Sequence, residues 1–326
     1  MRERILNYLI RYQGDCISGQ ELSERLNISR TAIWKHINNL QEQGFQIEAQ
    51  SGKGYALREI PDLLYPELIR ANLNTEYIGQ EIRYFKETGS TNKVAKKLAD
   101  DGFPEGTVVV TEKQNEGRGR LGRSWESPAQ KGIWFSLILR PLIDPPTAPS
   151  ITLLIAVAMA RALKKGLAVN ALIKWPNDLY LGEKKICGIL TEMKADMDKI
   201  EYIIAGIGLN VNQKQEEFPE ELQKQATSLR EEMGRETSRL DIIRSFLQEL
   251  EELYETYQKN GFVPIKQYWK EANMTLGRLV SVDTLDRVYQ GTAVDITEDG
   301  GLIVDTPGGR MTFRAGEVTL QKRAGR

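Results

Sequence analysis

Three arginines alternate with glycines between residues 117 and 123, where the sequence reads Gly-Arg-Gly-Arg-Leu-Gly-Arg. A guanidinium group presents its donors in a planar fork that matches carboxylate and phosphate oxygens. Glycine permits positive φ angles and lets a ligand approach the backbone closely. The pattern therefore predicts a loop that folds over an anion. Because Arg118, Arg120 and Arg123 repel one another and no acid stands among them, we expect the loop to be poorly ordered until that anion binds.

The same glycines match two known phosphate-binding patterns incompletely. Gly117, Gly119 and Gly122 have the spacing of the dinucleotide-binding fingerprint, and the segment is also one residue away from a P-loop. Both motifs open a helix, whereas Pro128 prevents a helix from continuing here. An arginine also stands where the P-loop has its phosphate-reaching lysine. The sequence therefore argues against a nicotinamide-dependent enzyme and against a P-loop protein, and an unspecific basic surface loop explains the alternation poorly.

A second motif, Lys-Trp-Pro-Asn-Asp, occupies residues 174–178. It is expected to form a turn between short strands at residues 171–173 and 179–181, and a partner strand returns over residues 184–192. A further strand at residues 203–211 contains glycines, which invite a ligand close to its backbone. These strands therefore bring polar groups of both motifs to one region.

Lys185 lies near the start of the returning strand. Side chains alternate along a strand, so we expect Lys185 and Cys187 on one face and Gly188 on the other. The lysine ammonium is a compact charge that suits the stabilisation of charge developing on a phosphate. Cys187 is expected to be a small packing residue rather than a nucleophile.

Histidine is rare in this chain. The 326 residues include one histidine, His36, and the formal net charge is −1. Histidine is the usual general base near neutral pH, so chemistry away from His36 must depend on positioning and on cations. The balanced charge also means that any contact with nucleic acid requires a local basic patch.

The composition is that of a globular protein with two or three domains, since 40 % of the residues are hydrophobic and 27 % are charged. The longest apolar stretch, residues 151–160, is short for a membrane span, and no signal peptide is visible. Cys16 and Cys187 are too few and too far apart for a disulfide framework or a zinc site. We therefore expect a cytoplasmic protein with no membrane partner.

Residues 1–62 predict three helices followed by a hairpin. Apolar residues recur at helical spacing, and Ser18 and Ser29 are placed to cap the second and third helices. Two alternating segments then flank a glycine-containing turn at residues 51–54, which carries Lys53. This order of elements is typical of a winged helix-turn-helix, which binds DNA, although a small helical docking domain is the alternative.

The third helix is the predicted DNA-reading element. It buries Ile33, Ile37 and Leu40, and its other faces carry cations and amides but no carboxylate between residues 29 and 41. Amides and guanidinium groups read base edges in the major groove, while lysines meet phosphates. His36 is expected to contact phosphate or to pack. The predicted DNA contacts are Ser29, Arg30, Thr31, Trp34, Lys35, Asn38 and, in the wing, Lys53.

The rest of the chain predicts two further domains. Residues 63–273 alternate between strands and helices, including a long helix at 240–257 and a shorter one at 264–272. Their polar segment 213–230 predicts a second mobile loop. Residues 274–326 contain short strands with glycine turns, which suit a small barrel.

The motifs resemble the biotin–protein ligase family in their order and approximate spacing. The segments that carry the resemblance are Ser90-Thr91-Asn92, residues 117–123, residues 174–178, residues 185–189 and residues 206–210. With its N-terminal head the chain is similar to the bifunctional group of that family, the biotin operon repressors. The resemblance covers nearly the whole chain. It implies an α+β multidomain fold: a winged helix-turn-helix, a central mixed α/β ligase domain similar to class II synthetases, and a C-terminal SH3-like β-barrel.

The resemblance also implies a reaction and its participants. In that family the carboxylate of biotin attacks the α-phosphate of ATP, and a lysine of a biotin carboxyl carrier protein then takes biotin from biotinyl-5′-AMP. The first step joins two anions, so fixed cations should dominate catalysis. The implied partners are the carrier protein, operator DNA and a second copy of the chain when biotinyl-5′-AMP is bound.

Site residues follow from the resemblance position by position. The implied catalytic residues are Lys185, Arg118, Arg120 and Asp178. The implied biotin contacts are Ser90, Thr91, Asn92, Gln114, Arg118, Gly119, Arg120, Lys185 and Gly188. The implied nucleotide contacts are Gly117, Arg123, Asn177 and Asn210. Asp178 is open to three roles, since it can hold Mg²⁺, orient Lys185 or help deprotonate the incoming amine; in the second loop, Phe218 or residues 226–229 are expected to contact adenine.

Two rival functions remain open. One is a transcription factor that senses biotin without ligating it, but the intact Lys185, Arg118 and Asp178 count against this. The other is a lipoate–protein ligase of related fold, which the Gly-Arg loop and the Lys-Trp-Pro-Asn-Asp motif disfavour.

Overall fold

The computed structural model describes residues 1–50, 52–196, 199–284 and 286–321. The chain forms two compact units, Met1–Ala71 and Asn72–Arg326, and each is described by itself. Ser51, in the predicted hairpin turn, lies outside the described residues, as do residues 322–326 of the predicted third domain.

The first unit contains α1 (Arg2–Arg11), α2 (Gly19–Leu26), α3 (Arg30–Glu42), β1 (Gln46–Gln50), β2 (Gly54–Glu59) and α4 (Pro66–Arg70). Ser18 caps α2 by accepting from the backbone N–H of Glu21 at 3.0 Å. Ser29 caps α3 in the same way through Ala32, at 3.2 Å. β1 and β2 pair antiparallel as the wing. The predicted winged helix-turn-helix is thereby confirmed.

The first unit ends later than the predicted boundary after residue 62. Leu64, Leu68 and Ile69 are fully buried, and α4 contacts α1. The ring of Tyr65 stacks on Phe45 with the centroids 6.4 Å apart. The residues directly after 62, which the sequence assigned to the central domain, therefore lead into a helix that completes the core of this unit.

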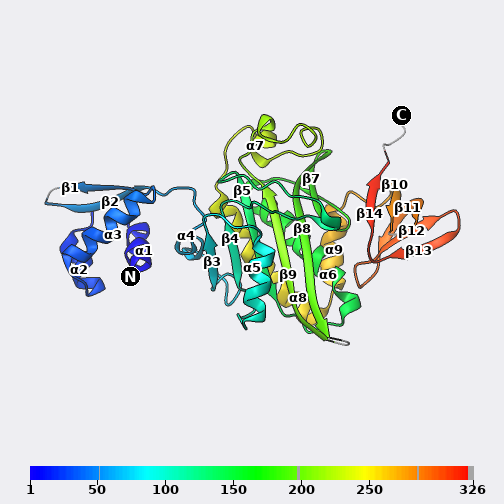
Figure 1. Cartoon of the computed structure of the whole chain (residues 1–326), viewed down its shortest axis with the longest axis horizontal. Coiled ribbons are helices and arrows are strands. Elements are labelled where there is room, and N and C mark those ends of the chain that lie inside the picture. Colours follow the sequence, from blue (N-terminus) through cyan, green and yellow to red (C-terminus); the bar gives the residue numbers. More distant parts are fainter. Residues whose placement is uncertain (51, 197–198, 285, 322–326) are drawn as a thin grey trace. The chain divides into compact units, whose positions relative to one another are not determined.

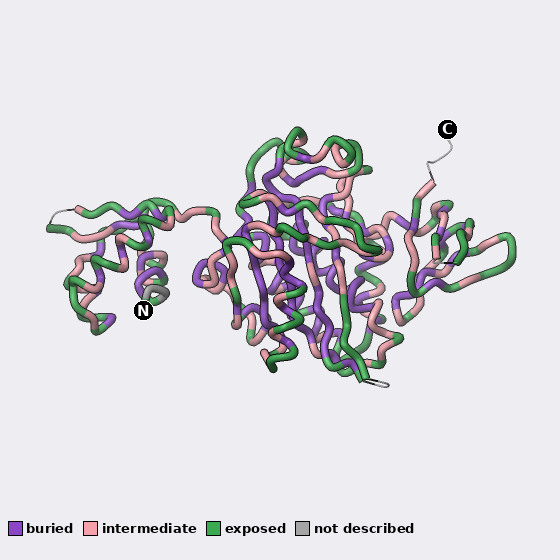
Figure 2. Tube along the Cα trace, in the orientation of Figure 1, coloured by how far each residue is buried: buried purple, intermediate pink, exposed green. Residues whose placement is uncertain are grey.

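A seven-stranded sheet forms the centre of the second unit, in the order β3-β4-β5-β9-β8-β7-β6 (Figure 1). β3 and β4 are parallel, and the other neighbours are antiparallel. The strands are β3 (Ile82–Phe85), β4 (Val108–Thr111), β5 (Gly132–Leu139), β6 (Leu172–Lys174), β7 (Asp178–Leu181), β8 (Lys184–Asp196) and β9 (Lys199–Asn210). Figure 2 shows the central strands buried along most of their length.

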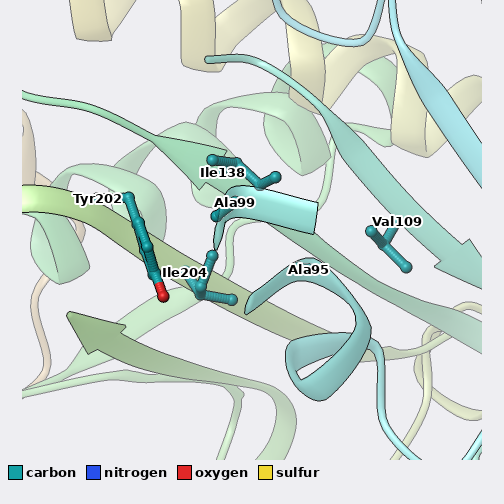
Figure 3. Close-up of a cluster of buried hydrophobic side chains, with 6 residues drawn as sticks. All are labelled: Ala95, Ala99, Val109, Ile138, Tyr202 and Ile204. Carbon is teal, nitrogen blue, oxygen red and sulfur yellow. The ribbon is translucent and has the colours of Figure 1, made fainter. Parts of the chain in front are cut away.

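Helices cover the two faces of this sheet. On one face lies α5 (Thr91–Asp100), where Ala95 and Ala99 pack against Val109, Ile138, Tyr202 and Ile204 (Figure 3). The other face is covered by α6 (Pro149–Leu167), α8 (Arg239–Asn260) and α9 (Val263–Ala272), as Figure 1 shows. The long helix predicted at residues 240–257 and the shorter one predicted at 264–272 are confirmed. The short helix α7 (Leu229–Met233) follows the second loop.

Helix α6 is strongly apolar. The stretch Pro145–Leu167 is long and apolar enough to cross a membrane by length and composition, and 72 % of its apolar part is buried inside the structure. α6 packs against α8, α9 and β8. Its hydropathy is therefore accounted for by its place between the sheet and the other helices.

The last part of the second unit is a five-stranded antiparallel sheet in the order β13-β12-β11-β10-β14, which agrees with the predicted SH3-like domain. The strands are β10 (Leu279–Asp283), β11 (Val288–Ile296), β12 (Leu302–Thr306), β13 (Gly309–Phe313) and β14 (Glu317–Leu320). The indole N–H of Trp175 donates to the carbonyl of Gly300 at 2.9 Å. A Cβ at Gly300 would lie 3.1 Å from the backbone of Ser150. These contacts fix the small sheet beside the Lys-Trp-Pro-Asn-Asp turn.

Candidate active site

A cavity of about 600 Å³ opens over the sheet of the second unit. It is lined by the Gly-Arg loop, the Lys-Trp-Pro-Asn-Asp turn, the N-terminus of α5 and parts of β8 and β9. The site residues predicted from the sequence that line it are Ser90, Thr91, Asn92, Gln114, Arg118, Gly119, Arg120, Arg123, Asn177, Asp178, Lys185, Gly188 and Asn210. Gly117 is not among the lining residues; a Cβ there would lie 2.2 Å from the carbonyl oxygen of Trp125.

The Gly-Arg loop folds back on itself as a narrow turn. The N–H of Gly119 donates to the carbonyl of Arg123 at 2.8 Å, and the N–H of Trp125 donates to the carbonyl of Gly117 at 2.9 Å. A short 3₁₀ turn, η1 (Arg120–Gly122), forms its tip, and the chain then leads into β5. No helix follows, as predicted, so neither the dinucleotide fingerprint nor the P-loop applies.

Two of the three arginines have polar partners. Arg120 donates to Asn177 Oδ1 at 3.0 Å and to the carbonyl of Gly316 at 3.1 Å. Arg123 makes a two-pronged ion pair with Glu317, at 2.8 and 2.5 Å. The expectation of arginines without a facing acid was therefore wrong, because the acid comes from β14, far away in sequence. The Arg123 guanidinium lowers the pKa of the Glu317 carboxyl.

Lys185 and Asp178 form the charged centre of the cavity. The ammonium nitrogen of Lys185 lies 2.6 Å from Asp178 Oδ1, and both side chains are largely shielded from solvent. The second loop also holds the backbone of Lys185: its N–H donates to Gln225 at 2.8 Å, and its carbonyl accepts from Thr227 at 3.0 Å. Lys185 is therefore fixed both at its backbone and at its charge.

The predicted alternation of faces along β8 was wrong. The register between β7 and β8 shifts, with Leu179 opposite Cys187 but Tyr180 opposite Lys185. This bulge adds a residue to β8, so Lys185 lies on the same side as Gly188. A Cβ at Gly188 would lie 3.3 Å from the Lys185 ammonium nitrogen. Cys187 is fully buried, and burial raises the pKa of its thiol, which agrees with a packing role.

A cluster of buried hydroxyls and amides forms one end of the cavity. Gln114 Oε1 accepts from the Thr91 N–H at 2.9 Å and from the Thr91 hydroxyl at 3.1 Å. The Ser136 hydroxyl lies 2.7 Å from Thr91 Oγ1 and 2.6 Å from Asn92 Oδ1. The hydroxyl groups of Thr91 and Ser136 supply two protons, but they take part in three close oxygen–oxygen contacts. Hydrogen-bond acceptors in the cluster therefore outnumber donors. The cluster therefore matches a ligand that brings N–H donors.

Side chains of the site, rather than a ligand, fill the space beside the glycines of β9. A Cβ at Gly206 would lie 2.1 Å from Asn92 Oδ1, and one at Gly208 would lie 2.3 Å from Trp125 Nε1. The expected reason for these glycines was therefore wrong in part. They admit Asn92 and Trp125 to the sheet surface, and these side chains in turn shape the cavity.

Asn177 and Asn210 are buried and hydrogen-bonded. The Asn177 amide donates to the carbonyl of Ile189 at 2.9 Å while its oxygen accepts from Arg120. The Asn210 amide donates to the carbonyl of Thr227 at 3.1 Å. Both side chains thus organise the cavity wall and the second loop.

The second loop contributes Phe218, Leu222, Gln225 and Ala226 to the cavity lining. Of the two predicted contact segments, Phe218 and Ala226 face the cavity, whereas residues 227–229 are buried outside its lining. This loop therefore supplies the apolar surface that a planar ring would need.

The site holds residues that the sequence did not single out. Ser136, Trp125, Lys174, Tyr180 and Glu317 contact or line it. Lys174 lies inside a motif and Trp125 follows the other by two residues, so their place in the sequence was a usable signal. Burial lowers the pKa of Lys174, whose ammonium lies 5.4 Å from the ring centroid of Tyr180. Ser136 and Glu317 lie in ordinary strands and gave no local signal.

Metal binding has limited support from the protein alone. Among the described residues no group of three or more His, Cys, Asp or Glu side chains is placed to hold a metal ion. The carboxylate of Asp178 already neutralises Lys185. A Mg²⁺ ion needs few protein ligands when phosphates supply the others, so Asp178 fits only an ion that is shared with a phosphate ligand.

The predicted DNA contacts lie in the first unit, on α3 and in the turn of the wing. Ser29, Arg30, Thr31, Trp34, Lys35 and Lys53 are exposed, and Asn38 is half-buried. The exposed fraction of Trp34 is 57 %, which is high for the largest side chain. Ile33, Ile37 and Leu40 are buried as predicted. α3 therefore presents one polar face while the opposite stripe holds it in the core.

The fold and the site define a class of protein: a synthetase-like ligase with a DNA-binding head and a small β domain. Comparison with known proteins supports each part. Residues 84–210 match the model of the biotin/lipoate A/B protein ligase family, residues 2–56 match an HTH domain, and residues 275–320 match the biotin protein ligase C-terminal domain.

Relatives match the whole chain. The bifunctional ligase/repressor BirA of Bacillus spizizenii is 40 % identical over 98 % of each chain, and that of Bacillus subtilis is 39 % identical over 98 % of each. The solved biotin protein ligase from Aquifex aeolicus in complex with biotin and ATP aligns with a TM-score of 0.65 and 30 % identity, covering 74 % of this chain and 99 % of that one. The chain belongs to the family of bifunctional biotin ligase/repressors.

Proposed function

We propose that this chain activates biotin with ATP, transfers it to a lysine of a biotin carboxyl carrier protein, and represses transcription through its head. The observation that carries the ligase half is the place of the Lys185–Asp178 pair, between the Gly-Arg loop and the acceptor-rich polar cluster. One cavity thus offers cations for a carboxylate and a phosphate, together with acceptors for the donors of a bound acid.

The proposed first step joins two anions. A carboxylate oxygen of biotin attacks the α-phosphorus of ATP, and the bond to pyrophosphate breaks. Lys185 neutralises the charge that develops between the two groups, with Arg118 and Arg120 closing over them. Gly119 and Gly188 let the ligand approach the backbone. Of the three roles expected for Asp178, its 2.6 Å contact with the Lys185 ammonium favours the orientation of Lys185.

The proposed second step transfers biotin to the carrier. The lysine amine of the carrier attacks the carbonyl carbon of the mixed anhydride, AMP leaves, and the new amide bond forms with loss of a proton from the nitrogen. Closure of the loop over the adenylate keeps water away until the carrier arrives. Arg123 forms an ion pair with Glu317. To bind nucleotide, the Arg123 guanidinium is expected either to break this pair or to contact Glu317 and the nucleotide at the same time.

Nucleotide is proposed to lie between Asn177, Asn210 and the second loop, where Phe218 and Ala226 offer apolar contact to adenine. We propose that Mg²⁺ enters with the ATP phosphates, next to Asp178, and supplies further charge neutralisation there. The remaining ligands of the ion would be phosphate oxygens and water.

The polar cluster favours biotin over lipoate. The ureido ring of biotin has two N–H donors, which suit the excess acceptors of Thr91, Asn92, Gln114 and Ser136. Lipoate has a dithiolane ring without N–H groups, so its binding would leave buried acceptors unpaired. The test is incorporation of labelled biotin into a carrier domain with ATP, beside a labelled lipoate control. Biotin alone is expected to label the carrier; labelling by lipoate alone, or by neither acid, would contradict the proposal.

The repressor half needs two heads for a palindromic operator. We propose that biotinyl-5′-AMP orders the loops and favours a dimer of the chain. Sedimentation velocity with and without biotin plus ATP tests this. A dimer fraction that rises with the ligands is expected; an unchanged fraction would overturn the proposal.

A cytoplasmic location is also proposed, supported by Cys16 and Cys187, which are both free thiols.

A further inference from the structure

The side chain of Trp125 lies directly against the charged centre of the cavity. The ammonium nitrogen of Lys185 lies 5.2 Å from the centroid of the Trp125 ring, and the same nitrogen pairs with Asp178. A cation at this distance is attracted by the negative face of an aromatic ring, most strongly by that of tryptophan. Lys185 is therefore held by two different groups, a carboxylate and an indole.

The sheet provides a flat seat for the indole. Gly188 on β8 pairs with Gly208 on β9. A Cβ at Gly188 would lie 2.9 Å from the Trp125 ring, and one at Gly208 would lie 2.3 Å from its nitrogen. Two neighbouring strands thus lack side chains at the place where the ring rests, so the ring packs onto backbone beside Lys185.

The position of the ring depends on the Gly-Arg loop. Trp125 is the last residue of the closed turn, and its N–H donates to Gly117 at 2.9 Å. Arg118 and Ser124 pair across the same turn. The indole nitrogen is buried and, within the described part of the chain, has no hydrogen-bond partner. The ring is therefore held by packing on the sheet and by the Lys185 ammonium, and its backbone belongs to the loop.

We propose that Trp125 is a positioning residue for Lys185, which the closing Gly-Arg loop brings onto the lysine. The inference rests on the proposed role of Lys185 in adenylate formation. The loop then has a second task besides enclosing the ligand: closure completes the environment of the lysine. Adenylation is thereby coupled to closure, so that the reactive anhydride forms only where water is already excluded.

Two substitutions separate the aromatic face from the volume of the side chain. Trp125→Phe keeps a ring, whereas Trp125→Leu keeps an apolar side chain without one. We expect kcat for biotinyl-5′-AMP formation to stay within about threefold of wild type for Trp125→Phe and to fall about tenfold for Trp125→Leu. Gly166→Ala is a matched control, since a Cβ at this α6 glycine meets nothing within 4 Å.

A double-mutant cycle with Lys185→Gln tests whether the indole acts through the lysine. Rates are measured in single-turnover reactions with α-labelled ATP and enzyme in excess, so that slow variants remain measurable. In the Lys185→Gln background, Trp125→Leu is expected to change the rate less than about twofold. A tenfold fall in both backgrounds would overturn the proposal, as would equal loss in Trp125→Phe and Trp125→Leu. If wild type itself made no biotinyl-5′-AMP, the proposed function would fail instead.

Discussion

The cavity of the second unit and the outer face of α3 are both suited to anionic ligands, but they are built in opposite ways. In the cavity the cations are partly buried and held by named partners, as Lys185 is by Asp178 and Arg120 is by Asn177. On α3, Arg30 and Lys35 are exposed. Chemistry on a small ligand requires charges fixed in place before the reaction. Binding along a duplex gains from many exposed contacts, each of modest strength.

This difference predicts that single changes in the cavity are severe and that single changes on α3 are moderate. Lys185→Gln is expected to have the largest effect, a fall in kcat for biotinyl-5′-AMP formation of about a thousandfold, because it removes the cation between two reacting anions. The measurement is release of pyrophosphate with saturating biotin and ATP. Lys184→Gln, on the neighbouring residue, whose ammonium donates to Gln215 outside the cavity, is the matched control and should stay near wild type. A Lys185→Gln enzyme with more than a tenth of the wild-type rate would contradict the fixed-charge account.

Arg30→Ala is expected to have an intermediate effect, confined to DNA. Its exposed guanidinium is proposed to supply one contact, so affinity for an operator duplex should fall about tenfold while kcat for biotin transfer is unchanged. Fluorescence anisotropy with biotin and ATP present measures the affinity. Arg11→Ala, an exposed arginine on α1 of the same unit, should bind as wild type. Equal losses in both variants would indicate a diffuse electrostatic effect rather than a reading helix.

Glu317→Gln should have the smallest effect, since its pair with Arg123 is partly exposed. We expect a loss of about 0.5–1 kcal/mol in the free energy of unfolding at pH 7. The Arg123 guanidinium lowers the pKa of folded Glu317 below its unfolded value. The stabilisation is therefore complete above the unfolded pKa and is lost as the pH falls through the folded one.

Urea unfolding of wild type and Glu317→Gln, measured at pH 7 and in steps through the acid range, tests this sign. The difference in stability between the two proteins should shrink as the pH falls through the folded pKa of Glu317. Asp305→Asn removes an exposed pair with Arg310 on the same small sheet and is the matched control for the loss of a surface ion pair. A difference in stability that grows towards low pH would contradict the assignment.

Local patterns predicted most of the elements and most of the segments that line the cavity. The caps Ser18 and Ser29 and the buried stripe of α3 depend on neighbours within a few residues, so the sequence displays them directly. The loop and the Lys-Trp-Pro-Asn-Asp turn were visible for the same reason. The first unit was predicted too short because the five-residue helix α4, which begins at Pro66, is too short to show a periodic signal.

Contacts between distant segments could not be predicted from local patterns. Glu317 contacts Arg123, although the two residues lie far apart in the sequence. Ser136 joins the polar cluster from β5, where the residues next to it are apolar. The bulge in β8 also had no visible mark, and one extra residue reversed the expected faces of Lys185 and Gly188. Such features arise from register and packing, which become fixed only in the folded chain.

Adenylate formation by the purified wild-type chain tests the central claim most directly. With α-labelled ATP and enzyme in excess, biotin is expected to yield a labelled acyl-adenylate that stays bound, while lipoate yields none within the same time. That result would follow from cations fixed at Lys185 and from a polar cluster that needs N–H donors. Adenylation of lipoate at a rate equal to that of biotin, or of neither acid, would contradict the account.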